Sequence, residues 1–263
     1  KTSMTFGNVT EDEGDNALIF DHAGLKYAGA AESSLSDISF TLKKGGVLGV
    51  IGGTGSGKST LASLAARFYD ATEGSVYFMG HNIKDWSEGA LRKKAAVVMQ
   101  RAQLFSGTIR SNLLYGNPSA SDKELWEALA AAQADDFVRQ KPGMLDAEVE
   151  QGGRNFSGGQ RQRLSVARAL VSKPELLILD DSSSALDYAT DAAMRRAISK
   201  LPYKPTLIII SQRTATIEHA DNILVLDDGL LLGMGTHDEL LENCKVYREI
   251  HQSVLGEEDD GND

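Results

Sequence analysis

The loop from Gly52 to Thr60 constrains this chain more than any other stretch. It reads Gly-Gly-Thr-Gly-Ser-Gly-Lys-Ser-Thr and matches the pattern GxxxxGK[ST]. The apolar run Val47–Ile51 before it predicts a buried strand, and Leu61, Leu64 and Ala65 follow it at helical spacing. Between a strand and a helix N-terminus, glycines let the backbone N–H groups converge on an anion, which the helix dipole also favours. The sequence therefore predicts a phosphate-binding loop.

Two side chains of the loop extend this prediction. Lys58 supplies a positive charge for the outer phosphates, and the hydroxyl of Ser59 is a hard oxygen ligand for Mg²⁺. The alternative, a glycine-rich turn that binds nothing, would leave Lys58 and Ser59 without a purpose. The residues predicted to hold the phosphates are Gly52, Gly53, Thr54, Gly55, Ser56, Gly57, Lys58, Ser59 and Thr60.

Composition excludes several classes of protein. The formal net charge of -10 argues against a protein built to hold a nucleic acid backbone, so no nucleic acid partner is expected. No run of about eighteen apolar residues is present, so no membrane span is predicted. The polar, acidic start of the chain does not read as a signal peptide, and the lone Cys244 fits a reducing compartment.

Strands and helices alternate along most of the chain, which indicates an α/β fold with crossover connections. From about Arg101 to Lys173 helix formers dominate and strand patterns vanish, so this stretch is interpreted as a helical insertion. Closing helices are expected at Asp238–Leu241 and Lys245–Val254. The segments with strand patterns are Leu18–Phe20, Leu25–Tyr27, Ile38–Leu42, Val47–Ile51, Gly74–Phe78, Ala95–Met99, Leu176–Leu179, Thr206–Ile210, Ile223–Leu226 and a last strand within Gly229–Gly235.

Two carboxylates follow the apolar strand Leu176–Leu179. Polar side chains at the carboxyl end of a strand lie on the ligand side of an α/β sheet. Asp180 is placed to hold magnesium, and Asp181 to face an attacking water. The alternative is a solvated acidic turn.

Phe156-Ser157-Gly158-Gly159-Gln160, just before a predicted helix, indicates a second anion site. A helix N-cap at Ser157 would account for the start of the helix, but not for the Gly-Gly-Gln that follows. Two anion sites so far apart in one chain suggest that they meet across a dimer, each closing on the nucleotide of the partner.

With these motifs in order, the chain resembles the nucleotide-binding domain of ABC transporters of the exporter type. Gly52 to Thr60 is similar to Walker A, Phe156 to Gln160 to the signature motif, and Leu176 to Asp180 to Walker B. Gln100 lies at the Q-loop position and is implied to contact ATP and Mg²⁺, with Ser59 and Asp180 as the other metal ligands. Tyr27 lies where the family keeps the aromatic residue that stacks on adenine. The resemblance assigns the D-loop to Ser184, Ala185, Leu186 and Asp187.

The resemblance also implies an architecture. It is a RecA-like P-loop NTPase core of α/β class, with an antiparallel β subdomain and an inserted α-helical subdomain. Residues 1–16 would be a linker from a missing transmembrane domain, and 17–254 the nucleotide-binding domain. The core would occupy about 17–100 and 174–254, the helical subdomain about 101–173, and an acidic tail 255–263. The implied cofactors are ATP and Mg²⁺, and the implied place is the cytoplasmic face of a membrane, the fragment itself being soluble.

Two positions depart from the family pattern. The family has Glu after the Walker B Asp, where this chain has Asp181, and His at the switch position, where it has Gln212. Aspartate is one methylene shorter, which withdraws the carboxylate by roughly 1.5 Å, and glutamine carries no positive charge near neutral pH. Both losses affect hydrolysis and neither affects binding.

These departures predict one half of a heterodimeric exporter. The chain would bind MgATP at a degenerate, slowly hydrolysing site and lend its signature motif to the competent site of a partner subunit. Its partners would be a second nucleotide-binding domain and the transmembrane domain of the same transporter. The alternatives are a catalytically active homodimeric exporter domain, a soluble ABC ATPase without a transport role, a regulatory ATP-binding module and a P-loop kinase. The long coiled-coil insertions or tandem cassettes of soluble ABC ATPases are missing, and a kinase would have no use for Ser157 to Gln160.

Overall fold

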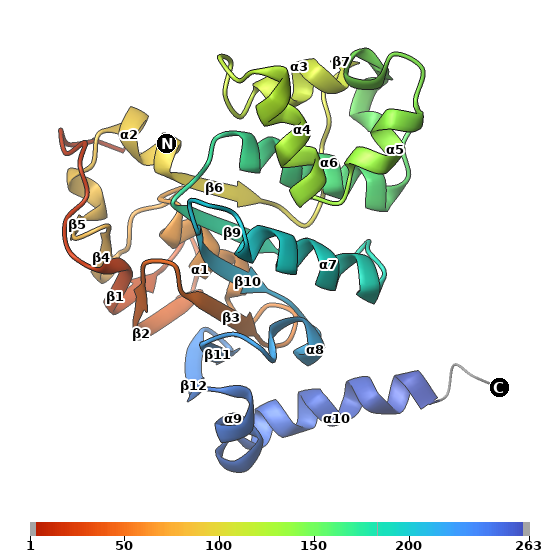
Figure 1. Cartoon of the computed structure of the whole chain (residues 1–263). Coiled ribbons are helices and arrows are strands. Elements are labelled where there is room, and N and C mark those ends of the chain that lie inside the picture. Colours follow the sequence, from red (N-terminus) through yellow and green to blue (C-terminus); the bar gives the residue numbers. More distant parts are fainter. Residues whose placement is uncertain (1–3, 183, 260–263) are drawn as a thin grey trace. The chain divides into compact units, whose positions relative to one another are not determined.

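Two stretches far apart in the sequence, residues 1–92 and 206–263, form one unit of the fold, and residues 93–205 form a second. The computed structural model describes residues 4–182 and 184–259, and, within the last helix, side chains as far as Ser253. Figure 1 shows the elements along the chain. The mixture of parallel strands and helices confirms the predicted α/β class.

An antiparallel sheet in the first unit has the strand order β2-β1-β4-β5. Its strands are β1 (Asn16–Leu25), β2 (Leu35–Lys43), β4 (Glu73–Phe78) and β5 (His81–Asn82). The prediction of a separate strand at Leu25–Tyr27 is wrong, because β1 runs from Asn16 and ends at Leu25. A bulge between Phe20 and Ala23, where His22 has a φ of 50°, breaks the pattern without ending the strand.

The other strands of the first unit lie in the order β12-β11-β3-β10. They are β3 (Val47–Ile51), β10 (Thr206–Ile210), β11 (Asn222–Asp227) and β12 (Leu230–Gly235). Both β10 and β11 run parallel to β3, and β12 pairs antiparallel with β11. Every residue of β10 is buried, as its continuous apolar run predicts.

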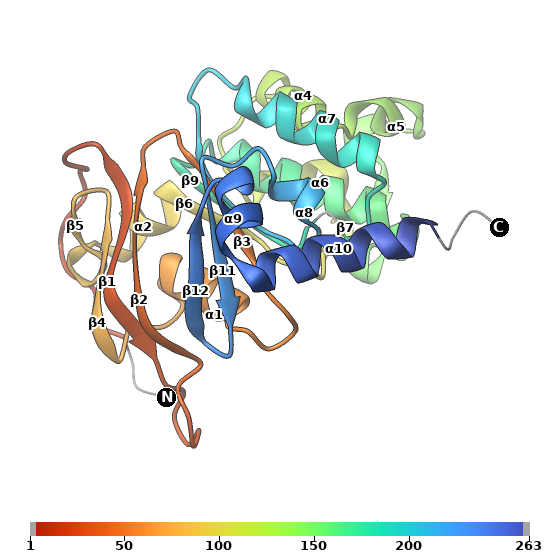
Figure 2. The same cartoon turned by 90° about the horizontal axis from the view of Figure 1, so that it is seen from below.

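The helices of the first unit are short except for the last. They are α1 (Lys58–Ala65), the 3₁₀ turn η1 (Ile83–Asp85), α8 (Thr214–Ile217), α9 (His237–Asn243) and α10 (Lys245–Asp259). A further short helix, α2 (Glu88–Lys94), begins in the first unit and has its last two residues in the second. Figure 2 shows α9 beside β11 and β12 and the length of α10. The predicted end of α10 at Val254 is wrong, since the helix continues through Asp259. Residues 260–263 lie outside the described residues.

The second unit pairs two parallel strands, β6 (Ala95–Val98) and β9 (Leu176–Asp180). Its helices are α3 (Ile109–Leu114), α4 (Asp122–Ala131), α5 (Asp135–Gln140), η2 (Met144–Asp146), η3 (Gln151–Gly153), α6 (Gly158–Val171) and α7 (Tyr188–Ser199). The expectation that strands vanish between 101 and 173 is wrong in detail, because β7 (Gly107–Thr108) pairs with β8 (Glu148–Val149). Two-residue strands are too short to leave a periodic pattern.

Residues 5–9 pack against other residues of the first unit. The Arg67 side chain is fully buried, donates to the carbonyl of Thr5 at 2.6 Å and lies 4.2 Å from the centre of the Phe6 ring. Val9 forms a β-bridge with Trp86. Whatever the role of residues 1–16, residues 5–9 are held in place.

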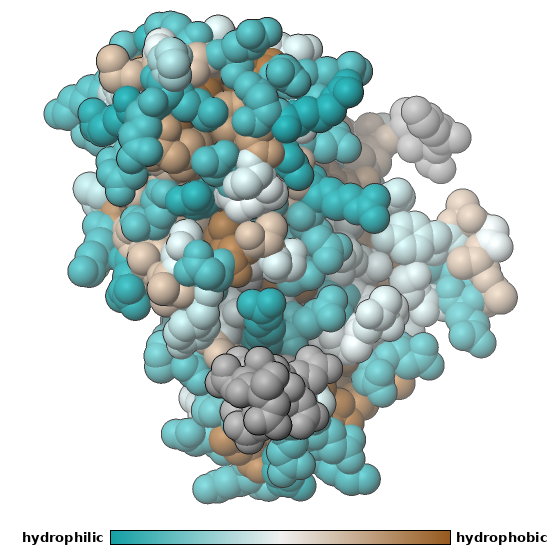
Figure 3. Space-filling view, turned by 90° about the vertical axis from the view of Figure 1, so that its right-hand side faces the viewer, coloured by the Kyte–Doolittle hydropathy of each residue, from teal (hydrophilic) through white to brown (hydrophobic). Residues whose placement is uncertain are grey.

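None of the helices among the described residues is long and apolar enough to cross a membrane. On the face seen in Figure 3, hydrophilic residues predominate and apolar residues are scattered.

Candidate functional site

The phosphate loop occupies the end of β3 and leads into α1, as predicted. Gly55 and Gly57 have φ angles of 81° and 102°, a region that L side chains rarely adopt. A Cβ added to Gly52 would lie 2.1 Å from the carbonyl oxygen of Leu226. Gly57 is the N-cap of α1, and no side chain caps that helix. The first N–H groups of α1 are thus left for a ligand, which suits a phosphate.

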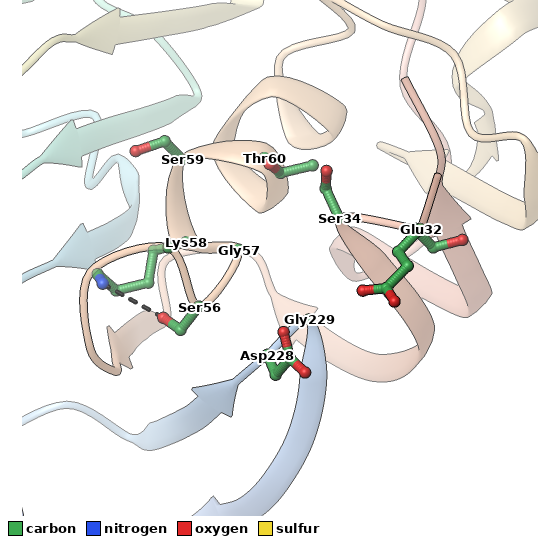
Figure 4. Close-up of a pocket in the computed structure, with 11 residues that line it drawn as sticks. Glu32, Ser34, Ser56, Gly57, Lys58, Ser59, Thr60, Asp228 and Gly229 are labelled. Atoms are coloured by element: carbon green, nitrogen blue, oxygen red, sulfur yellow. Dashed lines mark hydrogen bonds between the residues drawn. The ribbon is translucent and has the colours of Figure 1, made fainter. Parts of the chain in front are cut away.

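The ammonium group of Lys58 lies over its own loop. Its Nζ donates to the carbonyls of Gly52 at 2.7 Å and Gly53 at 2.6 Å, and to Oγ of Ser56 at 3.3 Å. Figure 4 shows the last of these bonds and the Ser59 side chain on the first turn of α1. The positive charge therefore lies at the mouth of the loop, where a phosphate would compete with these carbonyls for it.

A cavity of about 360 Å³ opens beside this loop, within the usual range for small ligands. Its lining combines loop residues with a segment before β2 and the β11–β12 turn. Sequence reasoning missed the latter two, and Figure 4 shows the Glu32 side chain reaching toward the β11–β12 turn. The missed residues are Glu32, Ser33, Ser34, Asp228 and Gly229.

The β11–β12 turn is bonded directly to the phosphate loop. The N–H of Gly229 donates to the carbonyl of Ser56 at 3.1 Å, and the N–H of Ser36 donates to the carbonyl of Gly229 at 2.9 Å. The signal in the sequence was Asp227-Asp228-Gly229 between two apolar strands, which marks a hairpin turn. Nothing local indicated that the turn would meet a loop far earlier in the chain.

Tyr27 reaches the helix that follows the loop. Its hydroxyl donates to Oγ1 of Thr60 at 3.3 Å, and its ring meets Tyr69 edge-on with centroids 5.0 Å apart. The ring is half-buried and does not line the cavity. Its proposed stacking on adenine remains a prediction.

Gln212 lies just beyond β10, the strand beside β3. Because both strands are parallel, with Ile210 opposite Val50, their carboxyl ends meet at the same edge. The N–H of Ser211 donates to the carbonyl of Val50 at 3.1 Å, and the Gln212 side chain is exposed. The first unit therefore brings Gln212 and the phosphate loop to one edge of the sheet.

The second unit brings Gln100 and Asp181 together. The register places Val98 of β6 opposite Leu179 of β9, so the residues after both strands are neighbours. Nε2 of Gln100 donates to Oδ2 of Asp181 at 2.8 Å. Asp180 at the end of β9 is only 5% exposed. The two aspartates thus differ: one is buried in the strand and the other carries a glutamine partner.

The predicted magnesium ligands fall into both units. Ser59 belongs to the first, and Gln100 and Asp180 to the second. Within the described residues, no group of three or more His, Cys, Asp or Glu side chains could hold a metal ion by itself. Each of these three side chains carries an oxygen atom of the kind that Mg²⁺ prefers as a ligand.

Ser157 caps α6 in the manner of a capping box. Its hydroxyl accepts the N–H of Gln160 at 3.1 Å, and its own N–H donates to Oε1 of Gln160 at 3.1 Å. The expectation that capping leaves the glutamine unexplained is therefore wrong, because Gln160 completes the cap. Phe156 is buried, and Lys141 Nζ lies 4.3 Å from the centre of its ring.

The two glycines of this segment lie against the predicted D-loop. A Cβ on Gly159 would meet the carbonyl oxygen of Ala185 at 3.1 Å, and one on Gly158 would lie 3.8 Å from the Cβ of Ala185. Leu186 is buried, and Asp187 caps α7 by accepting the N–H of Thr190 at 2.9 Å. That bond lowers the pKa of Asp187. The second unit thus holds the predicted signature and D-loop residues side by side.

Comparison with known proteins decides the family. Residues 35–184, more than half of the chain, match the family model described as ABC transporter. The chain belongs to the ABC transporter family.

Curated relatives of this ABC transporter chain have ATP-binding proteins of transporters among them, and one is named as an exporter. A Staphylococcus aureus protein, "Putative multidrug export ATP-binding/permease protein", is 40% identical over 231 residues, covering 88% of this chain. A Mycobacterium bovis protein, "Uncharacterized ABC transporter ATP-binding protein", is 43% identical over 234 residues, also covering 88%. The chain spans 40% of the length of each.

A solved structure gives the same result for the fold of the ABC domain. "Structure of a bacterial Atm1-family ABC exporter with ATP bound" matches with a TM-score of 0.86 and 34% identity, covering 94% of this chain and 43% of that one. The predicted P-loop NTPase fold and the resemblance to exporter-type ABC nucleotide-binding domains are thereby confirmed.

Proposed function

We propose that this chain is the ATP-binding motor domain of an ABC exporter whose own site binds MgATP and hydrolyses it slowly. In this proposal Lys58 and the first N–H groups of α1 hold the phosphates. Ser59, Gln100 and Asp180 hold Mg²⁺, which neutralises phosphate charge when bound. Support for binding comes from the uncapped start of α1, the left-handed glycines and the adjoining cavity.

Slow hydrolysis rests on Asp181 and Gln212. The Asp181 carboxylate is one methylene short of glutamate and already accepts a bond from Gln100. A general base contributes about 10² to 10⁴ in rate when it is within hydrogen-bond reach of the water. Gln212, at the edge of the sheet that bears the phosphate loop, can donate one neutral hydrogen bond to a terminal phosphate but cannot act as an imidazolium.

The partner in this proposal is a second nucleotide-binding domain, and the signature segment would serve the partner's nucleotide. The start of α6 supports this, because its first turn carries no acidic residue and Arg161 and Arg163 follow. The rest of the transporter would be a transmembrane domain like the permease portion named in the S. aureus relative. The domain would then work at the cytoplasmic face of a membrane.

The observation that carries the slow-hydrolysis proposal is Asp181, with its glutamine partner, where the family has glutamate. The test compares ATP turnover and ATP affinity of the wild type with Asp181→Glu plus Gln212→His. Paired with a competent partner domain, the double variant should turn over ATP at least tenfold faster at unchanged affinity. Asp238→Glu plus Gln140→His, the same exchanges at exposed positions, is the matched control.

Two outcomes would contradict the proposal. If ATP turnover of the double variant rose only about twofold, the result would favour the catalytically active homodimer, in which Asp181 and Gln212 are tolerated variants. If Lys58→Ala left ATP affinity unchanged, the nucleotide site itself would be misassigned. Co-purification with a membrane subunit would distinguish an exporter domain from a soluble ABC ATPase.

A further inference from the structure

A chain of ring and hydroxyl contacts links the C-terminal helices to the segment after β10. Nδ1 of His251, on α10, is hydrogen bonded to Oγ1 of Thr214 at 2.8 Å. The His251 ring meets the His237 ring edge-on at 5.3 Å, and Nδ1 of His237 is hydrogen bonded to the hydroxyl of Tyr247 at 2.7 Å. All four residues belong to the first unit.

Two of the residues in this series of contacts, Tyr247 and Thr214, are buried. Tyr247 has no exposed surface, and Thr214 is 2% exposed. If a buried hydroxyl loses its hydrogen-bond partner, the fold is destabilised by the desolvation penalty of that hydroxyl, because no water replaces the partner. Water therefore cannot take the place of His251 as the hydrogen-bond partner of Thr214 on α8.

The short helix α8 has two supports. On one side Ile217 packs against β3 at Gly49, where an added Cβ would come within 2.8 Å of the Ile217 Cβ. On the other side Thr214 is bonded to α10. A helix of four residues, whose N-cap Arg213 makes no side-chain capping bond, is not stable alone, so these contacts decide its position.

Gln212 lies between α8 and the end of β10. The N–H of Arg213 donates to Oγ of Ser211 at 3.0 Å, and Ser211 is bonded to Val50 of β3. Only Gln212 and Arg213 separate the residue bonded to β3 from the residue bonded to His251. A shift of α8 must therefore move the Gln212 backbone.

We infer that His251 is a positioning residue for Gln212: through Thr214 it fixes α8, and so fixes where the Gln212 side chain meets the terminal phosphate of ATP. This rests on the proposed function, since it takes Gln212 as the group that contacts that phosphate. The inference adds that the C-terminal helix governs how well the site distinguishes ATP from ADP.

The test uses the 263-residue chain and measures two quantities. One is the ratio of ADP to ATP dissociation constants, which isolates the terminal phosphate. The other is hydrogen exchange of residues 211–217 without nucleotide. The variants are His251→Leu, Thr214→Val and His251→Asn, which keeps a polar group near the position of Nδ1. Gln252→Leu, at an exposed neighbouring position, is the control.

His251→Leu and Thr214→Val should each lower the preference for ATP about fivefold, roughly the effect of one lost hydrogen bond. ADP affinity should stay the same, exchange of residues 211–217 should rise, and His251→Asn should restore much of both. In a Gln212→Ala background, His251→Leu should cause no further loss of preference.

Unchanged exchange of residues 211–217 in His251→Leu would overturn the inference whatever the nucleotide data show. So would an equal loss of ATP and ADP affinity, which indicates general damage. If exchange rises but Gln212→Ala leaves the preference for ATP unchanged, the role proposed for Gln212 fails, and the link from His251 to the phosphate fails with it.

Discussion

Nε2 of Gln100 lies 2.8 Å from Oδ2 of Asp181, while the Asp181 backbone has a φ of 46°. Asp181 is thus held by a side-chain partner and has a strained backbone conformation. An L residue in the left-handed region costs roughly 1–2 kcal/mol, least for Asp and Asn. The strain is offset only while the surrounding structure holds.

The backbone of Asp181 predicts an unusual order of stabilities. Asp181→Ala and Asp181→Gly both lose the bond from Gln100, but glycine relieves the left-handed strain. The glycine variant should therefore be the more stable by about 1 kcal/mol in chemical denaturation. The same pair at Lys123, on an exposed face of α4, should show the opposite order. Equal stabilities of the two Asp181 variants would mean that the backbone is not left-handed there.

The glycines of the phosphate loop should differ in their tolerance of alanine. At Gly53 an added Cβ meets nothing within 4 Å, so Gly53→Ala should change stability by at most about 0.5 kcal/mol. Gly55→Ala has the space but a φ of 81°, so it should cost about 1–2 kcal/mol. Gly57→Ala meets Leu35 at 2.7 Å as well, and should cost about 3 kcal/mol or more. Denaturant midpoints would check this order, and a Gly53→Ala as damaging as Gly57→Ala would contradict it.

Two carboxylates line the cavity beside the phosphate loop, where they would repel a bound polyphosphate. Glu32→Gln and Asp228→Asn should each tighten ATP binding, by about two- to threefold at low salt, because both side chains are exposed and screened. The gain should vanish near 1 M salt. Calorimetric titration at two ionic strengths would measure it, with Asp238→Asn as a control. A loss of affinity in Glu32→Gln would show instead that the carboxylate makes a favourable contact with the nucleotide.

The contribution of Glu124 to the free energy of unfolding should depend on pH. Glu124 accepts hydrogen bonds from Lys173 and from Ser121, which lower its pKa to about 2. A lowered pKa stabilises the fold above the unfolded value near 4.5, and the contribution disappears as pH falls toward 2. Glu124→Gln keeps an amide for the capping box but loses the carboxylate charge. Its free energy of unfolding should therefore be lower than that of the wild type at pH 6, and this difference should shrink below pH 4.5. A deficit that is independent of pH would indicate a packing effect.

The sequence predicted elements whose cause is local. The strand at Val47–Ile51, the loop and the start of α1 follow from apolar runs and glycines, and the structure has them at those residues. It did not predict that Asp228 and Gly229 would reach the loop, because that contact depends on the pairing of β11 with β3. The capping role of Gln160 was within reach, since Ser-x-x-Gln before a helix is a capping signal. The domain boundaries and the roles of the site residues stay predictions.

Arg67 connects residues 5–9 to the C-terminal end of α1. It lies just past the end of α1, where Arg92 donates to the carbonyls of Ala66 and Arg67. Its own buried guanidinium donates to the carbonyl of Thr5 and lies over the Phe6 ring. The opposite end of α1 begins with Lys58 and Ser59. A force applied to residues 5–9 would therefore act near the C-terminal end of α1, the helix whose N-terminal end faces the cavity. Such a force and a ligand in the cavity would act on the same helix.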